Sequence, residues 1–412
     1  MRILLRFITD GLKEAFSGSR LYFCWLGLLL SGLLLGGYAY CHQFRYGLQV
    51  TGMSDHVSWG FYISNFTFLV GVAAAAVMLV LPTYILKDMD FSKAVLLGEA
   101  VAVSALIMAL CFVTVDMGGP ERLWHLIPGL GYFNWPQSLL TWDVVVLNGY
   151  LGLNLLIPFW ILFNHYRGKK PNPKTYLPFV VLSVFWAVAI HMTTAFLYAG
   201  LPARPFWNSS LLGPRFLASA FAGGPALIIL ILGFFRSFKI YDIKADTLNK
   251  LALITTGAAQ VNLIMLASEL FKEFYWPTHH SSSARYLFFG LDGHHALTST
   301  IWAAVIINLV ATVVLTINPL RKRLWILFPT CIALFGAIYV EKGLGLVVPG
   351  FIPSPLGEVV EYFPSTIELM VAMGILCLGL GVFTVLSKAA VAIETGRLCH
   401  PDVKPLSPPQ ET

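Results

Sequence analysis

Residues 21–44, LYFCWLGLLLSGLLLGGYAYCHQF, decide the fold class of this chain. The run contains no Asp, Glu, Lys or Arg, and as an α-helix it would be about 36 Å long. The hydrocarbon core of a bilayer is about 30 Å thick, so this length suffices for a tilted transmembrane helix. The stretch therefore predicts an integral membrane protein.

The rest of the sequence repeats this pattern. We expect further spans at 58–86, 94–115, 141–165, 176–198, 214–236, 247–274, 295–318, 323–341 and 365–387. The 412 residues are 57% hydrophobic and 12% charged, and soluble domains carry about twice that charge. The composition predicts an all-α membrane protein of about ten transmembrane helices. Its parts would be an amphipathic segment at 1–20, a membrane domain at 21–396 and a tail at 397–412.

Most of the 27 Lys and Arg residues fall in alternate connections, on the side of the two termini. The positive-inside rule places this side, and both termini, in the cytoplasm. The net charge of +6 is then a signal of topology and does not indicate nucleic-acid binding. The cytoplasmic set is Arg2, Arg6, Lys13, Arg20, Lys87, Lys93, Arg167, Lys169, Lys170, Lys174, Arg236, Lys239, Lys244, Lys250, Arg321, Lys322, Arg323, Lys388, Arg397 and Lys404. The opposite loops hold Arg45, Arg122, Arg204, Arg285 and Lys342.

The histidines and cysteines argue against a metal cofactor in this chain. The six cysteines contain no CxxC pair, so the sequence offers no iron–sulfur or zinc site. A membrane-bound b-type haem needs facing histidines deep in a bundle, and only His191 is plainly deep. We expect any iron–sulfur cluster to belong to another subunit.

The long connections on the side opposite the termini indicate where the protein works. They span 116–140, 199–213, 275–294 and 342–364 and are rich in Trp, Pro, Gly and His. An aromatic belt accounts for some of the Trp residues, but not for the length of the loops. Because long ordered loops usually carry function, we expect the working face to be the periplasmic one of a bacterial inner membrane.

The outer end of the third span is the densest group of polar residues. Reduction of a quinone requires protonation of two carbonyl oxygens by donors such as His, Tyr or Asp, in an apolar slot with aromatic walls. The alternative is a loop folded over helix ends with ordinary ion pairs such as Asp116–Arg122. The group comprises Asp116, Arg122, His125, Tyr132, Asn134 and Asp143, and Asp55 and His56 can approach it from before the second span.

Placing an ionisable residue within a transmembrane span costs free energy, so such residues are candidates for a function. In the seventh span, Thr255, Asn262, Glu269 and Glu273 recur on one helical face, and Lys272 could pair with Glu269. This face is either a polar seam between helices or a water-lined proton path.

Four further ionisable residues lie in or beside spans, and two of them, His191 and Glu99, have two interpretations each. His191 is a structural histidine or a step in a proton path. Glu99 either extends to the interface or opens a proton inlet. Glu361 and Glu368 are interpreted as charges at a helix N-terminus, which the helix dipole favours.

Three stretches resemble the NrfD/PsrC family of membrane quinone-interacting subunits, in its ten-span branch. The first is 59–71, WGFYISNFTFLVG, which is similar to the family's first core helix. The second is 116–125, DMGGPERLWH, which is similar to its acidic Gly-Pro-Arg-x-Trp-His turn, followed by 134–143. The third is 202–207, PARPFW. Within the family, the chain looks most like the membrane subunit of menaquinone reductase complexes, with the Dsr and Hme membrane complexes as near alternatives.

The resemblance implies a core of two four-helix bundles plus two peripheral helices, and no haem or iron–sulfur cluster in the subunit. It also implies a menaquinone pocket near the periplasmic face, a docked iron–sulfur subunit, and further redox subunits such as a multihaem cytochrome c. Such a complex would serve anaerobic respiration. Carried over to this sequence, the catalytic residues would be Asp116, His125 and His56. The quinone contacts would be Arg122, Tyr132, Asn134, Trp59, Asp143 and Arg204, and the proton path would use Glu269, Glu273, Lys272, Glu99 and His191.

Two other functions remain as alternatives. A secondary transporter would need an inverted repeat and a midplane site on broken helices, and no pair of Gly/Pro-interrupted spans occurs at matching positions. A structural anchor would hold an extrinsic complex on the membrane, but it assigns no role to Asp116, His125 or Glu269.

Overall fold

Ten helices in the computed structural model are long and apolar enough to cross a membrane. The structure describes residues 2–85, 91–276 and 278–401, and within them it contains helices and loops but no strands. The predicted all-α fold with about ten spans is confirmed. The helices are α1 (Arg2–Ala15), α2 (Arg20–Tyr46), η1 (Leu48–Val50), α3 (Phe61–Ala74), α4 (Val77–Val80), η2 (Leu81–Ile85), α5 (Ser92–Asp116), η4 (Pro120–Leu126), α6 (Leu139–Tyr166), α7 (Pro173–Ala199), η5 (Pro205–Trp207), α8 (Leu212–Ser237), α9 (Ala245–Tyr275), η6 (His279–Ser281), α10 (Ser282–Phe289), α11 (Thr298–Thr316), α12 (Asn318–Arg321), α13 (Leu324–Lys342), α14 (Leu344–Val347), η7 (Pro349–Phe351) and α15 (Thr366–Glu394).

Two spans are built from more than one helix. The second comprises α3, α4 and part of η2, over Phe61–Tyr84, and the ninth comprises α13, α14 and η7, over Leu324–Phe351. We expected Lys342 in an outer loop, and this was wrong. Lys342 is the buried last residue of α13, because α14 resumes the helix after Gly343 and carries the span on to Phe351.

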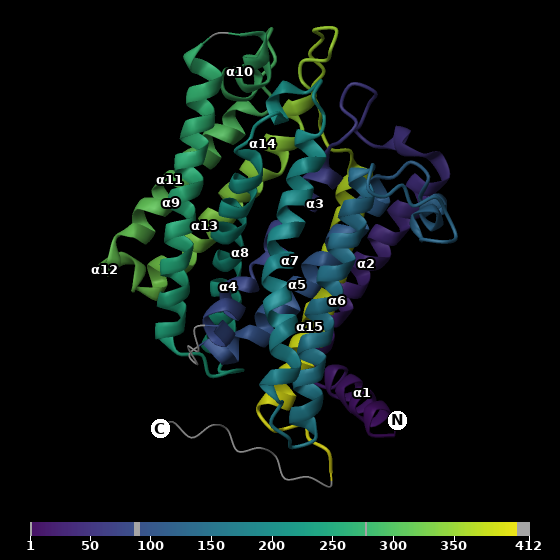
Figure 1. Cartoon of the computed structure of the whole chain (residues 1–412), viewed down its shortest axis with the longest axis vertical. Helices are drawn as coiled ribbons and strands as arrows, with labels where there is room; N and C mark the ends of the chain where they lie inside the picture. The colour runs from purple at the N-terminus through teal and green to yellow at the C-terminus, as the bar shows by residue number, and fades with distance from the viewer. Residues whose placement is uncertain (1, 86–90, 277, 402–412) are drawn as a thin grey trace.

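The eight central spans form two bundles, which confirms the predicted arrangement. The first bundle consists of α3, α5, α6 and α7, and the second consists of α8, α9, α11 and α13. Figure 1 shows the second bundle on the left and the first on the right. Helix α8 packs against α3 and α7, so the two bundles share a continuous core.

Helices α2 and α15 form a peripheral pair, and α15 also packs against α5 of the first bundle. Small residues let the pair approach closely, because a Cβ atom added at Gly36 would lie 2.5 Å from the Cα atom of Gly374. Helix α15 begins with a capping box, in which Ser365 and Glu368 satisfy each other's backbone N–H groups. The predicted N-terminal role of Glu368 is confirmed.

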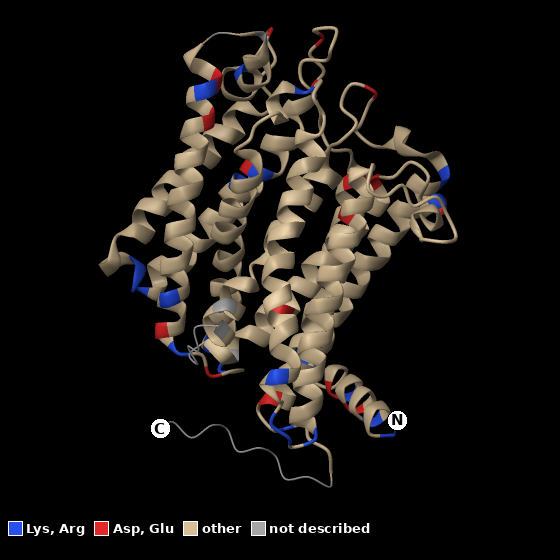
Figure 2. Ribbon diagram, viewed as in Figure 1, with Lys and Arg blue, Asp and Glu red and all other residues tan. Residues whose placement is uncertain are grey.

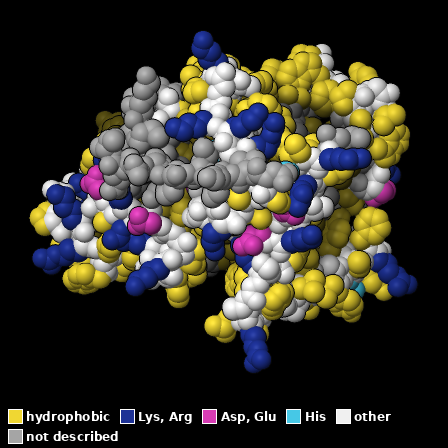
Figure 3. Space-filling view, turned by 90° about the horizontal axis from the view of Figure 1, so that it is seen from below, with side chains coloured by type: hydrophobic (Ala, Val, Ile, Leu, Met, Phe, Trp, Pro, Cys, Tyr) yellow, Lys and Arg dark blue, Asp and Glu magenta, His cyan; other side chains and the backbone are white. Residues whose placement is uncertain are grey.

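Helix α1 is amphipathic and lies at one end of the molecule, beside the end of α15 (Figure 1). We call this end the α1 end and the opposite one, which contains η4 and α10, the η4 end. Figure 2 shows Lys and Arg residues gathered at the α1 end, and few charged residues along the middle of the bundles. Figure 3 views this end from below and shows basic side chains at several separate places among hydrophobic ones. Lys87, Lys404 and the tail from 402 onwards lie outside the described residues.

Candidate functional site

Two aspartates stand where α5 ends and α6 begins, at the η4 end of the first bundle. Asp116 is the last residue of α5, and Asp143 lies near the start of α6. The buried Asp143 carboxylate accepts a hydrogen bond of 3.4 Å from Thr194 on α7. The Oδ1 atom of Asp116 is buried and has no hydrogen-bond partner among the described residues. Leaving a buried polar atom without a hydrogen bond costs free energy and is uncommon in native proteins. Asp116 is therefore a candidate for binding a proton or a ligand.

A cavity of about 200 Å³ lies between α5, η4 and α6, with Asp143 in its wall, and Asp116 immediately precedes the lining residue Met117. Three polar side chains, Thr114, Asp143 and Asn148, reach an otherwise apolar wall. The apolar wall is made by Leu110, Val113, Met117, Leu123, Leu126, Ile127, Leu140, Val144 and Leu147. An apolar pocket with a few converging polar groups suits a flat ring that carries carbonyl oxygens. The residues present therefore fit a quinone head group.

The other predicted residues of the 116–140 loop point away from this cavity. The side chain of Arg122 is 80% exposed and its Nε atom lies 3.9 Å from Glu121, so the expected alternative pair Asp116–Arg122 was wrong. His125 is exposed and packs beside Trp124, with ring centroids 3.9 Å apart, and Tyr132 is 82% exposed. These side chains are available at the surface of the η4 end.

The main-chain carbonyl of Asn134 accepts hydrogen bonds from Ser138 N at 2.9 Å and from Thr141 Oγ1 at 3.3 Å, which shapes the entry into α6. His56 lies before α3, with its Nδ1 atom 3.7 Å from Glu358. The structure thus brings Asp143 into the cavity wall, whereas Asp116 is not among the residues that line the cavity. It does not join His56 or His125 to Asp116 by any hydrogen bond between described residues.

Trp59 and Arg204 belong to an aromatic cluster between the two bundles. The Trp59 ring stacks on Trp207 at 5.8 Å and meets Tyr198 edge-on at 5.6 Å. Arg204 donates a hydrogen bond of 3.1 Å to the carbonyl of Phe351 and lies over its ring. Partial burial lowers the pKa of Arg204. These contacts fasten the α7–α8 loop to η7.

A second polar group at the η4 end involves Glu368, which sequence analysis treated only as a helix-end charge. Its carboxylate accepts hydrogen bonds from Tyr362 Oη at 2.6 Å and from Gly52 N at 2.6 Å. Burial and the Glu368 charge both raise the pKa of Tyr362. Nearby, Tyr62 donates to Gln43, and Gln43 donates to the carbonyl of Val115. This network fixes α2, α3 and α5 at the point where Asp116 sits.

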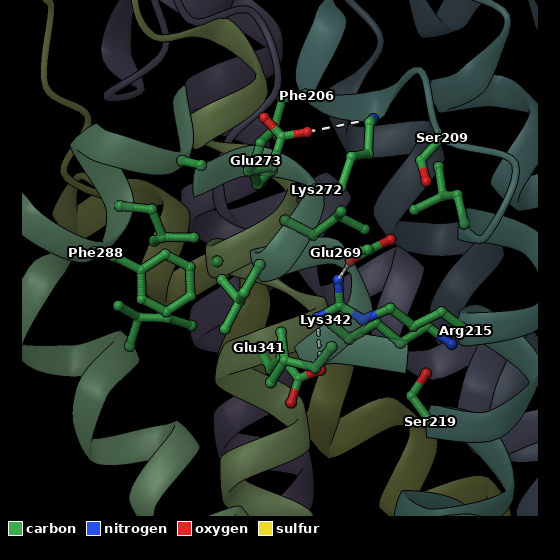
Figure 4. Close-up of a pocket in the computed structure, with 18 of the residues that line it drawn as sticks. Phe206, Ser209, Arg215, Ser219, Glu269, Lys272, Glu273, Phe288, Glu341 and Lys342 are labelled. Carbon is green, nitrogen blue, oxygen red and sulfur yellow. Dashed lines mark hydrogen bonds and ion pairs between the residues drawn. The ribbon is translucent and has the colours of Figure 1, made fainter. Parts of the chain in front are cut away.

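The second bundle contains a buried ion cluster, which Figure 4 shows around Arg215. Arg215 on α8 donates to Glu269 on α9 and, at 2.7 Å, to Glu341 on α13. Asn262 and Asn308 donate to Glu341 at 3.3 and 3.0 Å. Side chains from all four helices of the bundle therefore meet at the Glu341 carboxylate, and the Glu341 side chain is 4% exposed.

Lys342 extends this cluster towards the first bundle. Its ammonium donates a hydrogen bond of 3.1 Å to the carbonyl of Phe216 and lies 4.6 Å from the centre of that ring. A Cβ atom added at Gly71 on α3 would lie 3.0 Å from the ammonium, so Lys342 reaches the helix interface. A cavity of about 60 Å³ beside the cluster is lined by Arg215, Glu269 and Lys342. It could hold about four water molecules.

The polar face of α9 turns inward at Thr255 and Asn262, which are buried, and at Glu269, which joins the cluster. The expected pairing of Lys272 with Glu269 was wrong. Lys272 lies 3.3 Å from Glu273, because Arg215 occupies the Glu269 carboxylate.

Sequence analysis missed the roles of Arg215, Glu341 and Lys342. An arginine inside an apolar run was the available signal for Arg215. Its partners, 54 and 126 residues away, could not be paired with it from sequence.

His191 and Glu99 are both buried in the first bundle. His191 Nδ1 shares a hydrogen bond of 2.9 Å with the carbonyl of Ala187, and its Nε2 has no partner among the described residues. Glu99 does not extend to the interface, so that alternative was wrong. Within residues 2–85, 91–276 and 278–401, no three His, Cys, Asp or Glu side chains are grouped so as to hold a metal ion.

Comparison with known proteins places this architecture in a family. The sequence model of the family "Polysulphide reductase, NrfD" matches residues 49–348. The chain is 24% identical over 381 residues to the "Hdr-like menaquinol oxidoreductase integral membrane subunit" of Archaeoglobus fulgidus, covering 88% of this chain and 92% of the relative. It is 24% identical over 268 residues to a subunit of the selenate reductase of Mesobacillus selenatarsenatis, covering 57% and 61% of the two chains.

Proposed function

The chain belongs to the NrfD family, and from this premise we propose that it binds menaquinone in the cavity between α5, η4 and α6. It is a multi-pass membrane subunit of an oxidoreductase complex, as its relatives are. The observation that carries the proposal is the apolar cavity with Asp143 in its wall. The menaquinol oxidoreductase relative supports menaquinone as the ligand. The reaction would be of the menaquinone reductase type.

A bound quinone supplies a two-electron, two-proton redox couple to the site. The protein's part is to hold the ring in the apolar cavity, to exclude water and to position protons. Asp143, oriented by Thr194, is placed to hold a proton at the cavity wall. Asp116, which immediately precedes the lining residue Met117 and has a buried oxygen without a partner among the described residues, would hold a second one. Positioned proton donors of this kind typically contribute about 10²–10⁴ to the rate.

Electrons would come from or go to an iron–sulfur subunit docked on the η4 end, with further redox subunits such as a multihaem cytochrome c beyond it. Exposed aromatic and basic side chains of the 116–140 loop, including Trp124, Tyr132 and Arg122, support a contact surface there. The basic α1 end would face the cytoplasm of a bacterial inner membrane, in keeping with the positive-inside rule. The η4 end would then be periplasmic.

The test of this site is quinone turnover by the assembled complex carrying Asp143→Asn or Asp116→Asn. We expect turnover to fall at least ten-fold in each variant, with normal assembly. Asp292→Asn is the matched control, because Asp292 is an exposed aspartate at the same end with a left-handed backbone that asparagine also adopts. Normal turnover in both site variants would leave the subunit as a membrane anchor without quinone chemistry of its own.

We further propose that the reaction is coupled to proton uptake from the cytoplasm. The buried ion cluster at Arg215, with the small cavity beside it, supports a route along α9 to Glu269 and Glu273, and Lys342 links it to the first bundle. His191, whose Nε2 atom has no hydrogen-bond partner within the described part of the chain, is a further step in the first bundle.

The coupling is tested in liposomes that contain the whole complex. Quinone reduction should generate a membrane potential, worth about 2.3 kcal/mol per charge per 100 mV, and Glu269→Gln should abolish it. Asp246→Asn, on the same helix at the α1 end, is the control and should keep the potential. Quinone reduction without a potential in the wild type would make the cluster a packing element only.

A further inference from the structure

A second cavity lies at the α1 end, on the opposite side of the membrane domain from the proposed quinone site. Its volume is about 240 Å³, and its wall is made by α1, α5, α6 and α15. Phe7, Ile8, Gly11 and Leu12 of α1 form one side. The wall is apolar except for two side chains, Glu99 on α5 and Asn154 on α6.

Helix α1 is held in place by aromatic packing and a hydrogen bond to α6. Phe7 packs against Phe163 and Tyr166, with ring centroids 5.5 and 5.4 Å apart. The Tyr166 hydroxyl donates a hydrogen bond of 2.7 Å to Asp10. The cavity is therefore a built feature of the fold, with α1 as a fixed wall.

Glu99 indicates what the cavity can bind. Only 3% of the residue is exposed, and its Oε2 atom has no hydrogen-bond partner among the described residues. The amide of Asn154 donates to the carbonyl of Tyr150 at 2.9 Å, which leaves its own oxygen as an acceptor. A buried polar atom of this kind calls for a partner, and the apolar wall offers too few groups for a network of water. The partner should be a ligand that is apolar apart from a hydroxyl or carbonyl group.

The depth of Glu99 narrows the class of ligand. Glu99 is seven residues after Ser92, the first residue of α5, which places it about 10 Å along the helix. The polar groups of a phospholipid stay at the interface, so only its acyl tails would reach this level and Glu99 would remain unpaired. A quinone or quinol carries its polar ring into the hydrocarbon region and can meet Glu99 there.

We propose that the cavity at the α1 end binds a quinone or quinol of the membrane pool, hydrogen-bonded to Glu99 and Asn154. The ligand enters from the lipid between α1 and α6, where Ile8, Leu12 and Leu155 are exposed at the mouth. The existence of the site follows from its own geometry, and only the choice of a quinone rests on the proposed function. No redox step is assigned to it.

The test measures quinone per complex after purification of the whole complex in mild detergent. Gly11→Leu should lose one quinone, because a side chain there meets nothing within 4 Å and fills the cavity. Gly37→Leu is the matched control, since Gly37 is equally open but lies on the exposed face of α2. Glu99→Leu should show the same loss as Gly11→Leu, and Glu99→Gln, which can still form a hydrogen bond, should retain more quinone.

Equal quinone content in Gly11→Leu, Glu99→Leu and the control would overturn the proposal. Loss of a phospholipid in place of a quinone would overturn it too. Failure of the site at the η4 end is distinguishable, because it would appear as normal turnover in Asp143→Asn. The Gly11→Leu complex should keep wild-type turnover, since Gly11 has no part in the site at the η4 end.

Discussion

Replacing Arg215 by methionine removes the cation that joins Glu269 and Glu341. The Arg215 side chain is 16% exposed, and the Glu341 carboxylate is almost fully buried. Breaking a buried ion pair by removing one partner typically costs about 3–5 kcal/mol. Glu341 keeps its hydrogen bonds from Asn262 and Asn308, so we expect the low end of that range, about 3 kcal/mol.

The assay is denaturant or thermal unfolding of the purified subunit, with Arg122→Met as the control because the Arg122 side chain is 80% exposed and its Nε atom lies 3.9 Å from Glu121. The double variant Arg215→Met/Glu269→Gln should recover part of the lost stability, since it removes one of the two carboxylate charges that Arg215→Met leaves without a cation. An Arg215→Met protein as stable as the control would refute the account of the cluster as a buried, mutually dependent group.

Trp207→Phe should lower the unfolding temperature, because it removes a buried hydrogen bond of 2.9 Å to the carbonyl of Leu346, worth about 1–3 kcal/mol; an unchanged midpoint would contradict this. Gly71→Ala should destabilise the protein relative to Gly37→Ala, since its methyl group would lie 3.0 Å from the Lys342 ammonium, and equal stability of the two would show that Lys342 moves freely. The subunit purified alone should have no Soret band and no iron, and a stoichiometric b-type spectrum would overturn the assignment of electron transfer to partners.

The spans could be predicted because each is a local property of the chain. A run such as 21–44 has the length and composition of a transmembrane helix, whatever it packs against, and the structure places α2 there. The end of a span could not be predicted where a glycine interrupts the helix. Gly343 made the ninth span look complete at 341, and the sequence could not show that α14 continues it.

The polar sites were harder to predict, because their members come from distant segments. Asp143 and Glu269 were found as ionisable residues in or beside spans, but the partners of Glu269 were not. The contact of Arg215 with Glu341 depends on how α8 packs against α13, which no local pattern encodes. The exposure of these loop side chains could not be predicted either. Tyr132 and Arg122 are residue types that often line pockets, but both lie at the surface.

The central claim is that a quinone binds between α5, η4 and α6, and covalent labelling tests it most directly. The intact complex would be illuminated with a photoreactive naphthoquinone, and the labelled peptides identified by mass spectrometry. The account predicts labels within 110–117, 123–127 and 140–148, which line the cavity, and loss of these labels when excess menaquinone competes. Labels confined to the α1 end or to the Arg215 cluster, with none in these three segments, would contradict it.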